Sequence, residues 1–123
     1  MNKRILKHKG ECDYDYNNDI LFFKVYDREY SHSIELKNIV LDMDEENFIV
    51  GIQIFEASRF FNIPKEFIRS IKNWEFKANI EANTVEIRLI FNVVYRNKLI
   101  EKNPILIQPL NETIPNSKLI CTC

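Results

Sequence analysis

The chain has 123 residues, of which 46% are hydrophobic and 12% aromatic, with a formal net charge of −1 and a pI of about 6.1. This balance excludes a disordered chain, which needs low hydrophobicity and high net charge. It also argues against a nucleic-acid partner, because nucleic-acid-binding domains usually carry a basic excess. The length predicts a single compact domain over residues 1–123. With only two glycines, Gly10 and Gly51, the sequence has no glycine-rich phosphate loop.

The N-terminus, MNKRILKHKG, is too polar for an export signal, and no run approaches the ~20 apolar residues of a membrane span. We therefore expect a cytoplasmic protein without membrane contact. Disulfides are rare in the cytosol, so Cys12, Cys121 and Cys123 are predicted to be reduced thiols.

The first half of the chain predicts three strands. Residues 20–26 are short and rich in β-forming side chains, and residues 32–42 form a second extended run with a bend or bulge near Asn38. Residues 48–55 form a third strand, apolar on both faces and therefore covered on both sides. The polar turn at 44–47 predicts an antiparallel hairpin between the second and third strands.

The second half begins with a helical region and returns to strands. A short helical turn follows Ala57, and Pro64 suits the first turn of a helix over 64–73. Alternating patterns predict strands at 74–81, 84–95 and 99–109, and Pro104 predicts that the last is an edge strand or contains a bulge. Residues 111–123 are predicted to be a poorly anchored tail. The predicted fold class is α+β, with antiparallel meanders of about six strands and one short helical region between two strand-rich halves.

A string of short motifs carries a family resemblance. The motifs are Tyr14-Asp15, Asp19 to Val25, Ile39 to Asp44, Ile49 to Ile54, and Ala57-Ser58. Together they resemble a small prokaryotic family called domain of unknown function 2283, over about residues 14–60. Phe22, Asn47 and Gln53 stand where that family usually has tyrosine, glycine and glutamate.

The resemblance divides the chain into a family-like hairpin region, 14–63, and a helix-plus-meander extension, 64–110. It implies no activity, because the family has none established. Some members look like partners of small toxin-like proteins.

The stretch around the third strand holds the candidate binding patch: Gly51, Gln53, Glu56 and Ser58. Gly51 most simply permits close packing across the strand. Ser58 is most simply explained as a helix cap whose oxygen accepts a backbone N–H. No nucleophile, base and orienting group can be assembled from sequence, so no catalytic residue is assigned.

Three further features admit a site as well as a structural explanation. Residues 13–19 imitate the start of a calcium loop but lack its glycine and final glutamate, so a turn capped by Asp and Asn is favoured. Cys12, Cys121 and Cys123 could hold zinc, but their spacing fits no standard finger and free thiols are favoured. Lys3, Arg4, Lys7 and Lys9 form a basic arm that could touch phosphate, and a solvated end is favoured.

The sequence therefore favours a noncatalytic protein-interaction or self-association module, a homo-oligomer or a partner of another protein, without a cofactor. The alternative is a small-molecule-binding protein or weak hydrolase with a pocket near Gln53, Glu56 and Ser58.

Overall fold

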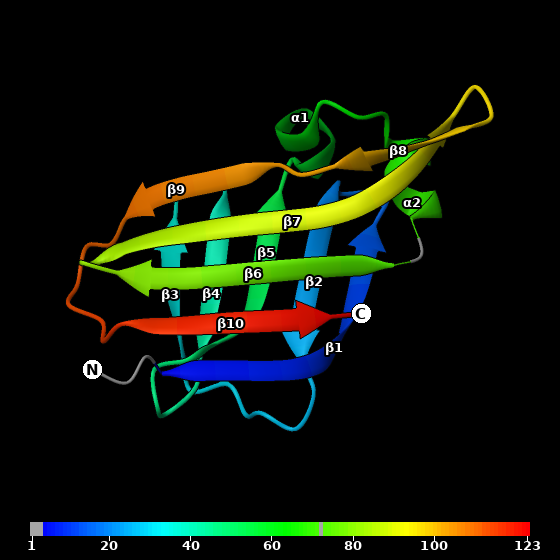
Figure 1. Cartoon of the computed structure of the whole chain (residues 1–123). Helices are drawn as coiled ribbons and strands as arrows, with labels where there is room; N and C mark the ends of the chain where they lie inside the picture. The colour runs from blue at the N-terminus through cyan, green and yellow to red at the C-terminus, as the bar shows by residue number, and fades with distance from the viewer. Residues whose placement is uncertain (1–3, 72) are drawn as a thin grey trace.

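The computed structural model describes residues 4–71 and 73–123. These residues form ten strands in one curled sheet and two short helices (Figure 1). The strands run β3-β4-β5-β2-β1-β10-β6-β7-β8 across the sheet, and β9 also pairs with β7. The elements are β1 (Ile5–Asp15), β2 (Ile20–Val25), β3 (His32–Leu36), β4 (Ile39–Met43), β5 (Ile49–Phe55), α1 (Ala57–Phe61), α2 (Lys65–Ser70), β6 (Trp74–Glu81), β7 (Thr84–Tyr95), β8 (Lys98–Lys102), β9 (Ile105–Pro109) and β10 (Ser117–Thr122).

The sheet folds over itself into two layers. In Figure 1, β6, β7, β10 and the start of β1 cross in front of β2, β3, β4 and β5, nearly at right angles. This is the orthogonal packing of two sheets, in which a strand that bends from one layer to the other makes the corner. Here that strand is β1, since Ile5–Lys9 pair in parallel with β10 while Gly10–Asp15 pair antiparallel with β2.

Gly10 lies where β1 passes between the layers. A Cβ atom at this position would lie 2.4 Å from the Lys24 carbonyl oxygen and 2.7 Å from the Cys121 sulfur. Both distances are far below van der Waals contact, so only glycine allows the two layers to approach this closely.

The core lies between the layers and is rich in aromatic side chains. Phe23 of β2 packs on Phe76 of β6 with ring centroids 4.4 Å apart, and Trp74 and Phe91 are 4.5 Å apart. Phe61 of α1 completes the cluster, 5.4 Å from Phe91. Burying such rings contributes about 1.5–3 kcal/mol each, so the contact between layers supplies much of the stability.

The predicted α+β class is wrong, because the fold is mainly β, with ten strands rather than about six. Two strands, β1 and β10, escaped prediction. The inward positions of β1 include the small residues Gly10 and Cys12, which weaken its pattern. The segment 111–123, predicted to be a tail, contains β10, which lies between β1 and β6.

The run at 32–42 is also two strands rather than one. Asn38 has φ 64°, in the left-handed region that asparagine tolerates, and it turns β3 into β4.

Other expectations are confirmed. β4 and β5 form the expected antiparallel hairpin, and β5 is an interior strand between β4 and β2. Pro104 separates β8 from β9 at the sheet edge. Of the predicted helix 64–73, residues 65–70 are helical, while residue 72 lies outside the described residues. In the described part of the chain, no helix is long and apolar enough to span a membrane.

Candidate functional site

A polar cluster joins the two ends of the family-like region. Asp19, at the turn before β2, accepts the Tyr14 hydroxyl on Oδ1 at 2.5 Å and the Ser58 hydroxyl on Oδ2 at 2.6 Å. The backbone N–H of Ser58 also donates to Oδ1 at 2.9 Å, and that of Ala57 to the Asp19 carbonyl at 3.0 Å. Asp19 therefore caps α1 from a turn that is distant in sequence, a role that Glu56, at the helix start, does not fill with its own side chain.

The cluster has the electrostatics of a structural anchor. Partial burial acts to raise the pKa of Asp19, but the hydrogen bonds from Ser58 and Tyr14 outweigh it and hold that pKa below its usual value. Burial and the bond to Asp19 raise the pKa of Tyr14 well above its usual value. The lowered pKa makes this carboxylate a poorer general base, which favours a structural role for the cluster. The expected cap at Ser58 is corrected, because its hydroxyl donates to Asp19.

The predicted patch divides between different places. Gly51 and Gln53 lie on the outer face of β5, whereas Ser58 belongs to the Asp19 cluster. Glu56 is exposed, 3.5 Å from Arg59. Ser58 and Glu56 are not among the residues that line the groove beside Gln53.

That groove runs over the outer face of the layer formed by β2, β3, β4 and β5, with a volume of about 300 Å³. Phe22, Tyr30 and Asp42 line it together with Gln53. Asp42 packs against Gly51, where a Cβ atom would lie 2.9 Å from Asp42 Oδ2. Ser33 of β3 donates to Asp42 Oδ1 of β4 at 2.9 Å and orients the carboxylate. The groove offers an aromatic wall and an oriented carboxylate to a small ligand.

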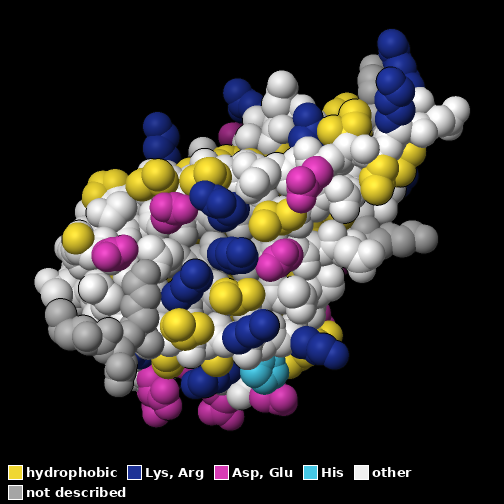
Figure 2. Space-filling view, in the orientation of Figure 1, with side chains coloured by type: hydrophobic (Ala, Val, Ile, Leu, Met, Phe, Trp, Pro, Cys, Tyr) yellow, Lys and Arg dark blue, Asp and Glu magenta, His cyan; other side chains and the backbone are white. Residues whose placement is uncertain are grey.

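An apolar strip along the opposite sheet edge is the feature that residue patterns did not single out. Val94, Leu99, Ile105 and Ile107 are 64%, 71%, 47% and 62% exposed. Figure 2 shows hydrophobic side chains along the border formed by β9 and the β7–β8 hairpin. The available signal was the alternation across 98–109 around Pro104, which predicted an edge strand but not an uncovered apolar one.

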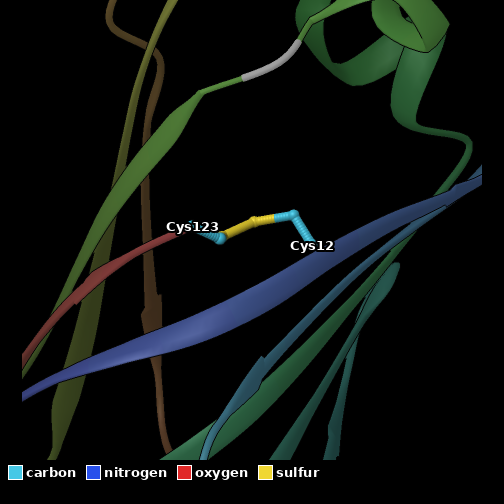
Figure 3. The surroundings of a disulfide bond; sticks show 2 residues. All are labelled: Cys12 and Cys123. Atoms are coloured by element: carbon cyan, nitrogen blue, oxygen red, sulfur yellow. A yellow bond between two sulfur atoms is a disulfide. The ribbon is translucent and has the colours of Figure 1, made fainter.

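The cysteines correct the expectation of three reduced thiols. Cys12 of β1 and Cys123, just after β10, form a disulfide with their Cα atoms 5.9 Å apart (Figure 3). Cys121 is a free, fully buried thiol, and burial raises its pKa to about 11. In this state two of the three sulfurs proposed for zinc are bonded to each other. Across residues 4–71 and 73–123, no three His, Cys, Asp or Glu side chains are placed to hold a metal ion.

The remaining sequence features have structural roles. Asp15 accepts the Asn18 backbone N–H at 3.1 Å and its side-chain amide at 2.8 Å, so the calcium-like stretch is the expected capped turn, here before β2. Arg4 lies over the Phe48 ring, 4.3 Å from its centroid, and donates to the Glu46 carbonyl. Lys7 and Lys9 belong to β1, and Lys3 lies outside the described residues.

The fold and the Asp19 cluster define a small, mainly β protein in which a polar cluster ties β1 and the turn before β2 to a short helix. Residues 12–58 match the model of a family described as protein of unknown function (DUF2283), close to the range expected from the motifs. A Methanosarcina mazei protein named putative hypoxanthine phosphoribosyltransferase is 38% identical over 90 residues, covering 73% of each chain. The chain belongs to the DUF2283 family.

Other comparisons extend this assignment. An uncharacterised protein of Methanocaldococcus jannaschii is 28% identical over 99 residues, which cover 80% of this chain and 85% of that protein. No solved structure matches the chain. Tyr14, Asp19 and Ser58, which make the anchor, all lie within the matched segment.

Proposed function

We propose that this chain is a noncatalytic protein that acts by association, most simply with copies of itself. The observation that supports this is the apolar strip of Val94, Leu99, Ile105 and Ile107 beside an open strand edge. An edge strand that exposes apolar side chains is a template for pairing with another strand, and natural proteins usually block such edges with charge or cover.

The polar chemistry supports a noncatalytic role. The Ser58 hydroxyl donates to the Asp19 carboxylate, and the lowered pKa of that carboxylate makes it a poorer general base. This counts against the weak-hydrolase alternative, which placed Ser58 in a pocket with Gln53 and Glu56.

The activity printed in the name of the M. mazei protein is not proposed for this chain. Gly10 and Gly51 both lie inside strands, packed against neighbouring atoms. The helices α1 and α2 have only five and six residues. The described residues therefore offer no glycine-rich loop leading into a helix of the kind that holds phosphate.

Small-molecule binding in the Gln53 groove is a second candidate, favoured by the aromatic and carboxylate lining. Native mass spectrometry of the purified protein tests it by the small-molecule mass retained, and a Gln53→Leu variant should lose that mass. A protein partner of the toxin-like kind that the family resemblance suggested is a further form of the association proposal.

A cytoplasmic location stays part of this proposal. The Cys12–Cys123 disulfide is the observation that opposes it, because reducing compartments keep most thiols free.

The test of self-association is the mass of the protein in solution as a function of concentration. Light scattering coupled to size exclusion should give a multiple of 14.7 kDa at high concentration, falling toward one chain on dilution. The proposal is contradicted if the protein has the mass of one chain at every concentration tested. The highest concentration should be about a thousand times a micromolar Kd.

A further inference from the structure

The strands β8 and β9 act as one continuous edge strand. Their pairing with β7 keeps a single register, from Tyr95 opposite Lys98 to Phe91 opposite Lys102 and on to Arg88 opposite Ile105. Between the two strands, the Leu89 N–H donates to the Pro104 carbonyl at 3.1 Å. Residues 98–109 therefore run beside β7 without a change of register.

The direction of the backbone groups along this edge follows from that bond. In an antiparallel pair, residues alternate between pointing their N–H and C=O at the neighbouring strand and pointing them away. The Pro104 carbonyl points toward β7. The backbone N–H and C=O groups of residues 100, 102, 106 and 108 therefore point toward β7 as well. The odd-numbered residues from Leu99 to Ile107 direct their backbone groups to the open edge, and no strand lies beyond them in the described part of the sheet. Proline has no backbone N–H, but at position 104 that group would point toward β7. The backbone groups at the open edge are therefore all present.

We propose that two copies of the chain join through this edge, antiparallel, with Asn103 opposite Asn103 at a two-fold axis. This inference rests on the proposed self-association and names its surface and register. Odd-numbered residues must face odd-numbered residues for the outward groups to bond, which leaves registers that differ by two residues.

The side chains select one of these registers. Centred on Asn103, it places Leu99 opposite Ile107 of the second copy, and Ile100 opposite Leu106. Leu99 and Ile107 are the exposed pair on the outer face, whereas Ile100 and Leu106 are partly buried against the core. Each face of the new strand pair then contains an apolar pair, which the two-fold axis repeats. Shifting the two-fold axis by one residue in either direction puts Ile107 opposite Asn97 or Glu101.

Charge also favours this register. Glu101 falls opposite Ile105 of the second copy, whose own neighbour across the ladder is Arg88. Glu101 of one copy and Arg88 of the other are therefore separated by two strand spacings, so their backbones lie about 10 Å apart. Their side chains carry opposite charges and lie on the same outer face of the sheet. The arrangement is isologous, so each contact occurs twice. One strand edge buries less than a standard interface, which predicts a dimer of micromolar rather than nanomolar affinity.

Cysteine cross-linking tests the register directly. In the proposed dimer the two Asn103 Cα atoms lie about 5.5 Å apart, within the range that a disulfide spans. Asn103→Cys should therefore give a covalent dimer under mild oxidation, seen by intact mass and removed by reductant. Glu101→Cys is the matched control on the same strand, since its two copies would lie about 13 Å apart. The wild type controls for the native cysteines.

A second pair of variants tests the apolar contacts. Ile107→Lys should lower the association constant at least tenfold. Ile5→Lys changes a similarly exposed isoleucine, 56% exposed on β1, and should leave association unchanged. Both variants should keep the wild-type circular dichroism, since each changes an exposed side chain.

The outcomes separate the two proposals. A concentration-dependent dimer in which N103C cross-links and E101C does not supports the register. If the protein dimerises but N103C does not cross-link and I107K does not weaken association, the proposed interface at this edge is wrong. The proposal of self-association then still holds. Equal cross-linking of N103C and E101C also overturns the register, because it reports random collision. A monomer at every concentration, without cross-linking, overturns both.

Discussion

The disulfide between Cys12 and Cys123 carries the largest predicted share of stability for a single bond in this chain. It joins residues 111 positions apart and so closes nearly the whole sequence into a loop. The chain-entropy relation for a loop of this length gives about 4.8 kcal/mol at room temperature. A domain of this size has a total stability of about 5–15 kcal/mol, so reduction should remove a third or more of it. The Cys12→Ser variant should therefore melt roughly 15 °C or more below the oxidised wild type, at about 3–5 °C per kcal/mol.

Urea unfolding with and without reductant measures this contribution. The oxidised wild type should unfold at a higher urea midpoint than the reduced protein, and the reduced protein should match Cys12→Ser. The Cys12→Ser variant should not respond to reductant, because Cys121 and Cys123 remain as thiols. If oxidised and reduced wild type differ by less than about 1 kcal/mol, the entropic reasoning fails. A response of Cys12→Ser equal to that of the wild type would show that reductant acts elsewhere.

Three further predictions concern the anchor, the glycines and the free thiol. Asp19→Asn should cost about 2–3 kcal/mol in urea unfolding, because charge-assisted bonds from Tyr14 and Ser58 weaken. Because the pKa of Asp19 is lowered in the folded protein, its contribution to folding stability is fully present above the ordinary pKa of about 3.9. That contribution is lost as the pH falls through the pKa of the folded state. The wild type should therefore lose more stability on acidification than Asp19→Asn. The Cβ atom of Gly10→Ala would lie 2.4 Å from a backbone carbonyl, and this variant should lose about 3 kcal/mol of unfolding free energy. The Cβ atom of Gly51→Ala would lie 2.9 Å from the Asp42 side chain, which can move, and this variant should lose only about 1 kcal/mol. Equal losses would refute the distinction. Cys121, with its pKa raised to about 11, should resist alkylation at pH 8 until the protein unfolds, and labelling at the rate of an exposed thiol would contradict its burial.

The strands that the sequence predicted well are those with a clean alternation of buried and exposed residues. β6 alternates along its length, and its bounds agree with the predicted 74–81. β1 carries a weaker signal, because its inward positions include Gly10 and Cys12 rather than large apolar residues. The space that these small side chains leave is filled by Cys121 and by the disulfide, which no local pattern reveals.

The candidate patch is divided in space for a related reason. Gln53, Glu56 and Ser58 are close in sequence, and that nearness predicted a single patch. A strand sends alternate residues to opposite faces, and the left-handed residue Glu56 (φ 56°) then turns the chain into α1. Nearness in sequence therefore did not become nearness in space. The true partner of Ser58 is Asp19, a motif residue 39 positions away, which the resemblance named without giving it a role.

The matched family segment coincides with one layer of the sandwich. Residues 12–58 contain the second half of β1, β2 to β5 and the start of α1, while β6 to β10 form most of the other layer. The inward face of the family layer, with Phe23, Leu41 and Ile52 buried to 2% or less, has to be covered by apolar surface. In this chain the extension supplies that cover from within, through contacts such as Phe23 on Phe76. The extension also creates a new open edge at β8 and β9, so the same addition that completes the core provides the surface through which we expect the protein to associate.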